Sequence, residues 1–217
     1  MTLADFVGIE SDDTVISLGD YVDRGPNSRA VLDWLIDRHK TGRLIPLRGN
    51  HEIMMMEARR DDELCQQWMG FGGMATLNSY SPFEGQAGVL ADVPESHWLF
   101  LENDLRATFE TKTHFFVHAN ADPTLPFQDQ PDDMLYWEKF NDPPLHESGK
   151  IMVCGHTSQK SGIPITNGNA ICIDTWVYGH GWLSCLDVET GTIWQANEAG
   201  QTRMLSLDAI GMENNNG

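Results

Sequence analysis

Two short segments of this sequence hold a dense set of reactive side chains. They are Gly19-Asp20-Tyr21-Val22-Asp23-Arg24-Gly25 and Gly49-Asn50-His51-Glu52. Hydrolysis of a phosphate ester requires metal ions that activate water and neutralise phosphoryl oxygens, together with an acid for the leaving group. Carboxylate, amide, imidazole and guanidinium groups can meet each of these needs. The two segments therefore indicate phosphate ester chemistry.

Two later histidines share the sequence context of Asp20 and Asn50. His118 follows the apolar run Phe115-Phe116-Val117, and His156 follows residues 151–155, so each of the four polar residues comes after a predicted strand. Oxygen and nitrogen ligands placed in this way can converge on one sheet edge and bind a metal. Taken singly, either histidine is better explained as a hydrogen-bonded residue at a strand end. Together with the two glycine-bounded loops, both are predicted to be metal ligands.

The residues beside the predicted ligands have types suited to acid catalysis. His51 is adjacent to Asn50, and Asp23 on the first loop could hold the His51 imidazole protonated and correctly oriented. The guanidinium of Arg24 matches the geometry of phosphate oxygens. The alternative for Asp23 and Arg24 is a local salt bridge within a turn.

The first half of the sequence predicts the elements that position these loops. Residues 14–18 are expected to form a buried strand, residues 27–42 a helix, and residues 44–47 a second strand. This order defines a βαβ unit whose two strands both end in a reactive loop. Helices are predicted over most of residues 52–77 and over residues 94–105.

The second half is richer in strand patterns. Glu189-Thr190-Gly191 is typical of a hairpin turn. Together the halves predict an α/β fold. The predicted strands are residues 107–110, 114–117, 151–154, 170–173, 183–188 and 192–196.

Composition limits the partners of the chain. Its 217 residues are 41% hydrophobic, which is enough for one sizeable domain with a core. Fourteen basic and 32 acidic residues give a net charge of −18, which argues against a nucleic acid or an anionic membrane as partner. A phosphate site would therefore need local positive charge from metal ions and a few arginines.

Cysteine usage and hydropathy indicate the compartment. Cys65, Cys154, Cys172 and Cys185 show no CxxC spacing, so buried reduced thiols are expected. No basic segment followed by an apolar run opens the chain, and no apolar stretch is long enough to cross a bilayer. A cytoplasmic protein is the expectation.

The two loops resemble a known family signature. Gly-Asp-Tyr-Val-Asp-Arg-Gly at residues 19–25 and Leu-Arg-Gly-Asn-His-Glu at residues 47–52 are similar to the motifs of the phosphoprotein phosphatase family of calcineurin-like metallophosphoesterases. Phe116-Val117-His118-Ala119 and Cys154-Gly155-His156-Thr157 resemble its two histidine ligand motifs. The similarity spans roughly residues 14–196. Within the family, the motifs most resemble those of the small bacterial and phage serine/threonine phosphatases.

The resemblance implies a fold and a metal centre. The fold is a β-sandwich flanked by helices, in one domain over residues 1–217. The centre holds two divalent ions, with Mn as the first expectation and Fe or Zn as alternatives. The implied metal ligands are Asp20, Asn50, His118 and His156, with Asp20 bridging both ions.

The resemblance also implies roles in turnover. A metal-bound hydroxide attacks phosphorus, His51 paired with Asp23 protonates the leaving oxygen, and Arg24 and Asn50 bind the phosphate. Lys139 stands where the small bacterial and phage members carry a further arginine, and Tyr178 is expected to contact the substrate. The remaining histidines are interpreted as structural or exposed: His39, His97, His114, His146 and His180.

One family motif is missing. An earlier Gly-Asp-x-His-Gly on a first strand supplies two ligands to the first ion, and residues 1–18 hold no histidine. Leu3, Phe6 and Val7 instead resemble the end of the family's first helix. Either the numbering starts late in a longer protein, which is favoured because a lost central strand would expose sheet edges, or this is a natural one-metal variant. The chain as numbered is expected to hold one ion tightly.

Three functions follow from these patterns. The first is metal-dependent hydrolysis of phosphate monoesters on protein serine or threonine, with tyrosine also accepted. The second is symmetrical hydrolysis of dinucleoside tetraphosphates. The third is a metal-depleted, weakly active variant that binds phosphate. The expected partner is thus a phosphorylated protein or peptide, or a small phosphate ester.

Overall fold

The computed structural model describes residues 2–83 and 85–214, with the side chains described as far as residue 211. The chain divides into two compact units. Residues 14–107 form one of them, named here the helical unit. The other, the sheet unit, combines residues 1–13 with residues 108–217.

The helical unit begins with the predicted βαβ arrangement. Strand β1 (Val15–Ser17) is followed by helix α2 (Ser28–Lys40) and strand β2 (Leu44–Pro46). The two strands pair in parallel, with Val15 opposite Leu44 and Ser17 opposite Pro46. The three elements lie within the ranges predicted from the sequence, so that prediction is confirmed.

Helices make up the rest of this unit. Asp61 caps the N-terminus of the helix Asp62–Trp68. Its side-chain oxygen accepts the backbone N–H groups of Glu63 and Leu64, a standard N-terminal cap. Leu32, Met55, Trp68 and Leu101 are among the fully buried side chains of its core. The elements are α3 (Asn50–Ala58), α4 (Asp62–Trp68), a π-helical turn (Met69–Gly73), α5 (Met74–Tyr80), a 3₁₀ turn (Leu90–Asp92) and α6 (Glu95–Asn103).

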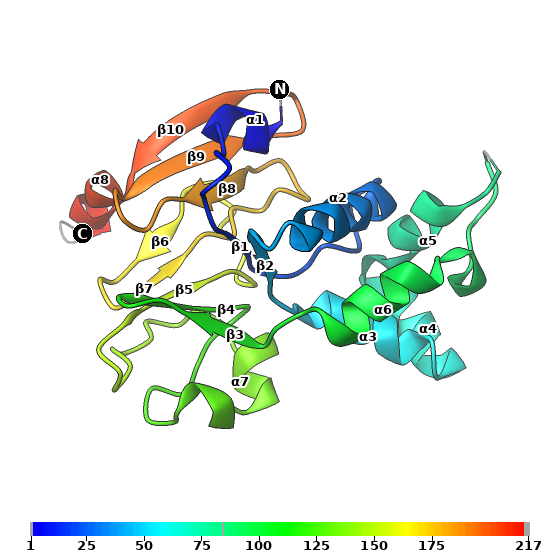
Figure 1. The fold of residues 1–217 in the computed structure, drawn as a ribbon, viewed down its shortest axis with the longest axis horizontal. Coiled ribbons are helices and arrows are strands. Elements are labelled where there is room, and N and C mark those ends of the chain that lie inside the picture. The colour runs from blue at the N-terminus through cyan, green and yellow to red at the C-terminus, as the bar shows by residue number, and fades with distance from the viewer. Residues whose placement is uncertain (1, 84, 215–217) are drawn as a thin grey trace. The chain divides into compact units, whose positions relative to one another are not determined.

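The sheet unit contains two sheets (Figure 1). In the five-stranded sheet, of order β3-β4-β5-β7-β6, strands β4, β5 and β7 run parallel while β3 and β6 are antiparallel edges. The three-stranded sheet β10-β9-β8 is antiparallel throughout. The strands are β3 (Thr108–Glu110), β4 (His114–Val117), β5 (Ile151–Cys154), β6 (Ile165–Thr166), β7 (Ala170–Cys172), β8 (Leu183–Leu186), β9 (Thr192–Ala196) and β10 (Thr202–Ser206).

All six strands predicted in the second half are present, and β8 and β9 form the predicted hairpin. Strands β6 and β10 were not predicted. The short helices of the sheet unit are α1 (Leu3–Val7), a 3₁₀ turn (Phe127–Asp129), α7 (Asp132–Tyr136) and α8 (Leu207–Asn214). Helix α1, expected from the resemblance, packs beside β8 and β9.

The structure adds two observations to the compositional predictions. All four cysteines are free thiols, as expected; Cys154 and Cys172 are buried, whereas Cys65 and Cys185 are only partly buried. In residues 2–83 and 85–214, no helix has the length and apolar character that a membrane crossing requires.

Candidate metal and phosphate site

The loop after β1 has an uncommon backbone conformation. Asp20, Asp23 and Arg24 all have positive φ angles, of 60°, 75° and 63°. Left-handed backbone at a non-glycine residue costs free energy and persists only where surrounding contacts enforce it. Something in the helical unit must therefore fix this loop.

Glu52 is the residue that fixes it. Its side chain is fully buried. Its two carboxylate oxygens accept backbone N–H groups from Asp20 at 2.9 Å, Tyr21 at 2.7 Å and Val22 at 3.3 Å. The same carboxylate accepts the N–H of Gly49 at 2.8 Å, at the start of α3. One side chain thus binds both predicted loops to each other.

We expect Glu52→Gln to lower the free energy of unfolding by about 2–4 kcal/mol, because an amide NH₂ would face backbone N–H groups that then lack an acceptor. Chemical denaturation monitored by circular dichroism measures the change. The matched control is Glu57→Gln, which makes the same chemical change at an exposed position of the same helix. Equal stability of the two variants would contradict the role of Glu52 in fixing the loop after β1.

His51 and Asp23 form a buried pair. His51 Nδ1 lies 2.6 Å from Asp23 Oδ2, and both side chains are almost completely shielded from solvent. Burial alone would lower the pKa of His51. The hydrogen bond to Asp23 and the charges of Asp20 and Asp23 outweigh it, so the pKa of His51 is raised above its ordinary value. The arrangement favours an imidazole that holds its proton.

The other predicted residues of this unit surround the pair. Asp20 Oδ1 accepts the backbone N–H of His51 at 3.3 Å. Asn50, the first residue of α3, is buried, whereas Arg24 is exposed at the end of the loop. Helix α3 and the β1 loop therefore bring Asp20, Asn50, His51, Asp23 and Arg24 into one neighbourhood.

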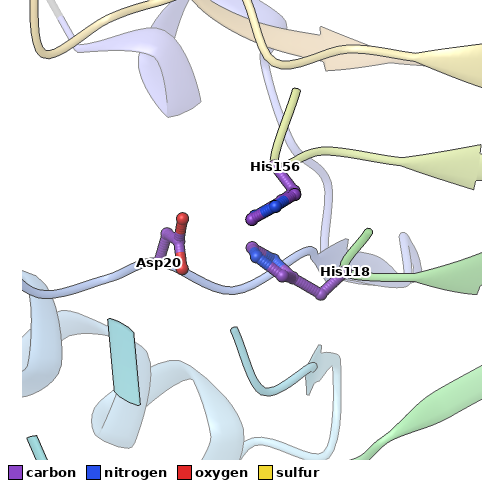
Figure 2. A group of neighbouring side chains, drawn as sticks. All are labelled: Asp20, His118 and His156. Carbon is purple, nitrogen blue, oxygen red and sulfur yellow. The ribbon is translucent and has the colours of Figure 1, made fainter. Parts of the chain in front are cut away.

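The sheet unit brings the two predicted histidines together. His118 follows β4 and is buried, and His156 follows β5, the parallel neighbour of β4. Their ring centroids are 5.1 Å apart, and their ligand nitrogens lie within 4.8 Å of each other. Figure 2 shows the two rings beside each other and also labels Asp20, which belongs to the helical unit.

The two substrate-binding residues predicted in the sheet unit lie near the histidine loops. The backbone carbonyl of Trp137 accepts a hydrogen bond from His156 Nε2. The backbone carbonyl of Lys139 accepts one from the side-chain amide of Asn120. The Lys139 side chain is exposed. Tyr178 is 42% exposed, and its hydroxyl lies 3.3 Å from Ser158 Oγ, two residues past His156. The Lys139 backbone and the Tyr178 hydroxyl thus contact residues two positions after His118 and His156, respectively.

Three residues around the site were not assigned a role from the sequence. Glu52 does have a local sequence signal, because its position three residues after Gly49 is that of a capping glutamate. Trp68 and Thr76 both donate hydrogen bonds to Asp23. Neither has a local sequence signal, because each is more than 40 residues from its acceptor.

Four of the histidines set aside have hydrogen-bond partners. His39 contacts the Leu44 carbonyl and His114 contacts the Thr113 hydroxyl. His97 bridges Tyr80 and Asp33, and His146 hydrogen bonds to the Leu125 carbonyl and to Ser148. Within residues 2–83 and 85–214, none of the five histidines set aside belongs to a group of three side chains that could hold a metal. Their interpretation as structural residues is consistent with these contacts.

The predicted ligands have donor atoms suited to a divalent ion. His118 and His156 offer two imidazole nitrogens close together, and Asp20 and Asn50 offer oxygens. Such mixed nitrogen and oxygen sets suit Mn, Fe and Zn. The residues present therefore fit a divalent metal ion.

Comparison with known proteins defines the family. The model for the family described as calcineurin-like phosphoesterase matches residues 1–181, a range that includes all the residues of the site. The chain therefore belongs to the calcineurin-like phosphoesterase family.

Particular relatives come from comparisons of sequence and of structure. The chain is 30% identical over 135 residues to Serine/threonine-protein phosphatase 1 of Salmonella typhimurium, which covers 62% of this chain and 53% of that protein. It is 46% identical over 46 residues to an uncharacterised protein of Schizosaccharomyces pombe, covering 19% of this chain and 14% of that protein. The chain thus spans about half or less of these relatives.

Two solved structures share the fold. A putative diadenosine tetraphosphatase superposes with a TM-score of 0.57 at 17% identity, covering 94% of this chain and 85% of that one. A cold-active protein tyrosine phosphatase superposes with a TM-score of 0.53 at 17% identity, covering 90% and 68%. These likenesses confirm the mixed α/β metallophosphoesterase fold predicted from the sequence.

Proposed function

We propose that this protein hydrolyses phosphate monoesters with the help of divalent metal ions. The observation that supports this most directly is the buried His51–Asp23 pair between the Asp20 loop and Asn50, with Arg24 exposed beside it. A protein that only bound phosphate would not need a buried histidine hydrogen bonded to a carboxylate. Membership of the calcineurin-like phosphoesterase family agrees with this chemistry.

The proposed ligands come from both units. Asp20 and Asn50 from the helical unit and His118 and His156 from the sheet unit would hold the ion, and the family match extends over both units. A bound divalent ion supplies an acidified water and offsets phosphate charge. Mn is the first candidate, with Fe or Zn as alternatives.

The residues of the helical unit perform the other tasks. Arg24 binds two phosphate oxygens through its forked guanidinium. Because Nδ1 of His51 faces Asp23, the atom that donates a proton to the leaving oxygen is Nε2. Lys139 and Tyr178 are the proposed substrate contacts of the sheet unit.

The proposed substrates are proteins or peptides phosphorylated on serine or threonine, with tyrosine also accepted. The similarity to Serine/threonine-protein phosphatase 1 supports this class. The strongly acidic composition argues against nucleic acid as a partner. A cytoplasmic location remains part of the proposal.

Substrate competition tests the assignment. The protein is loaded with Mn²⁺ and given a phosphoserine peptide, a phosphotyrosine peptide and diadenosine tetraphosphate, and the release of inorganic phosphate or of ADP is measured. We expect phosphate release from the phosphoserine peptide with the highest kcat/KM. ADP release alone would replace this function by tetraphosphate hydrolysis. Peptide binding without release of either product would show a phosphate-binding protein.

A further inference from the structure

Asp23 accepts hydrogen bonds from two further side chains besides that of its partner His51. The indole Nε1–H of Trp68 lies 2.8 Å from Asp23 Oδ2 and 3.0 Å from Oδ1. The hydroxyl of Thr76 donates to Oδ1 at 2.8 Å. All three partners, His51 included, are buried in the helical unit. The carboxylate is therefore held on both oxygens.

Thr76 is itself held in the orientation that this contact requires. Its oxygen accepts the backbone N–H of Asp23 at 2.7 Å. Since the single hydroxyl hydrogen points to Asp23, Ser28 must be the donor in its 3.2 Å contact with Thr76. A backbone group and a second hydroxyl thus fix the direction of the Thr76 proton.

The chain between Trp68 and Thr76 is shaped to approach the Asp23 loop. The segment Met69–Gly73 joins α4 to α5 and is kinked at Gly72, whose backbone is not helical. Gly72, with φ of 123°, accepts the backbone N–H of Arg24 at 3.2 Å, and a Cβ there would lie 2.9 Å from that nitrogen. A Cβ at Gly73 would lie 2.5 Å from the Trp68 ring. Both glycines permit contacts that a larger residue would prevent.

We propose that Trp68 and Thr76 are positioning residues for the acid His51. By holding the Asp23 carboxylate on both oxygens, they fix the direction of the His51 ring and so the place from which Nε2 delivers its proton. A mobile carboxylate would let the imidazole turn, and misplacement of about 1 Å can cost about 10²-fold in rate. The inference rests on the proposed function, because it assigns an orientation to that acid.

Kinetics with two leaving groups separate positioning from packing. Trp68→Phe keeps a buried ring but loses the N–H, and Thr76→Val keeps the shape but loses the hydroxyl. We expect each to lower kcat for phenyl phosphate by about 10-fold, which is less than the roughly 10²–10⁴-fold that a general acid contributes, because His51 is misplaced but still present. For p-nitrophenyl phosphate we expect kcat to fall by less than about 3-fold, because a good leaving group needs little protonation. KM should stay unchanged, and Thr76→Ser should restore turnover.

Trp98→Phe is the matched control. Trp98 is also a buried tryptophan of the helical unit, and its ring stacks on Arg59. We expect this variant to lose stability without any dependence on the leaving group. If Trp68→Phe and Thr76→Val lowered kcat for both substrates equally, or no more than Trp98→Phe does, the proposed role would be wrong.

A spectroscopic measurement tests the geometry without turnover. In ¹H–¹⁵N spectra of the full chain, the indole peak of Trp68 and the imidazole peaks of His51 should both shift in Thr76→Val, because Asp23 connects the two. They should not shift in Trp98→Phe. If the wild-type protein hydrolysed neither substrate, the proposed function would be wrong. These spectra would still show whether Asp23 connects Trp68 and Thr76 to His51. Unmoved peaks in Thr76→Val would overturn the positioning inference whatever the activity.

Discussion

Replacing His51 by asparagine is expected to lower kcat for a phosphoserine peptide by about 10²–10⁴-fold, the range that a general acid supplies. The alkoxide of serine is a poor leaving group, so it depends on the proton that His51 Nε2 would donate. Asparagine has similar width and can still hydrogen bond to Asp23, but it cannot transfer a proton at this position. Initial rates at saturating peptide, with metal content measured on the same samples, give the effect on turnover alone.

The control for this experiment is His97→Asn. His97 is another buried histidine of the helical unit, and its Nε2 lies 3.0 Å from an aspartate oxygen, on Asp33. Both variants remove a buried imidazole that is hydrogen bonded to an aspartate, and Asp33 differs from Asp23 in being largely exposed. A difference in kcat between the two variants therefore reports on the acid. We expect His97→Asn to lower the unfolding temperature and to leave kcat within about 3-fold of wild type, since losses of a buried contact act mainly on stability. Unchanged turnover in His51→Asn would refute the acid assignment.

The reactive loops were predictable because their signals are local. A short apolar run that stops at glycine, a helix, and a second such run predict a βαβ unit, and the chemistry follows each strand. The same logic predicts that His118 and His156 each follow a strand. In the structure these strands are parallel neighbours, and the two ring centroids are 5.1 Å apart. The ends of the strands and the side chains that follow them can thus be predicted from this sequence.

The support for Asp23 could not be predicted in this way. Trp68 and Thr76 lie 45 and 53 residues along the chain from Asp23, and a tryptophan or threonine within a helical pattern reads as core or surface. Strand β6, with two residues, and strand β10, with its partly polar sequence Thr-Arg-Met-Leu-Ser, lack the apolar pattern that identifies a buried strand. Long-range hydrogen bonds and edge strands are set by tertiary contacts that a single sequence does not display.

The proposed metal centre makes the second large prediction, because it requires one ion to be bound by residues of both units. We expect His118→Asn in the sheet unit and Asp20→Asn in the helical unit each to weaken Mn²⁺ binding by more than about 100-fold, the upper size of losses caused by partners that only support a ligand. Isothermal titration with Mn²⁺ after chelator treatment measures the affinity. Thermal unfolding adds a second readout, since an ion at about 100 times its Kd stabilises the folded state by about 2.7 kcal/mol.

Controls and a double variant decide whether the two units share the ion. His114→Gln alters a buried histidine at the other end of β4, the strand that precedes His118, and should keep wild-type affinity. If both ligands hold the same ion, the double variant Asp20→Asn/His118→Asn should lose far less than the sum of the two single losses, because the first loss already removes most of the binding that the second would affect. If Asp20→Asn bound Mn²⁺ as tightly as wild type, the histidines would bind the ion without the helical unit. The resemblance would then hold for the order of the motifs along the chain, but residues of the different motifs would not bind one ion together.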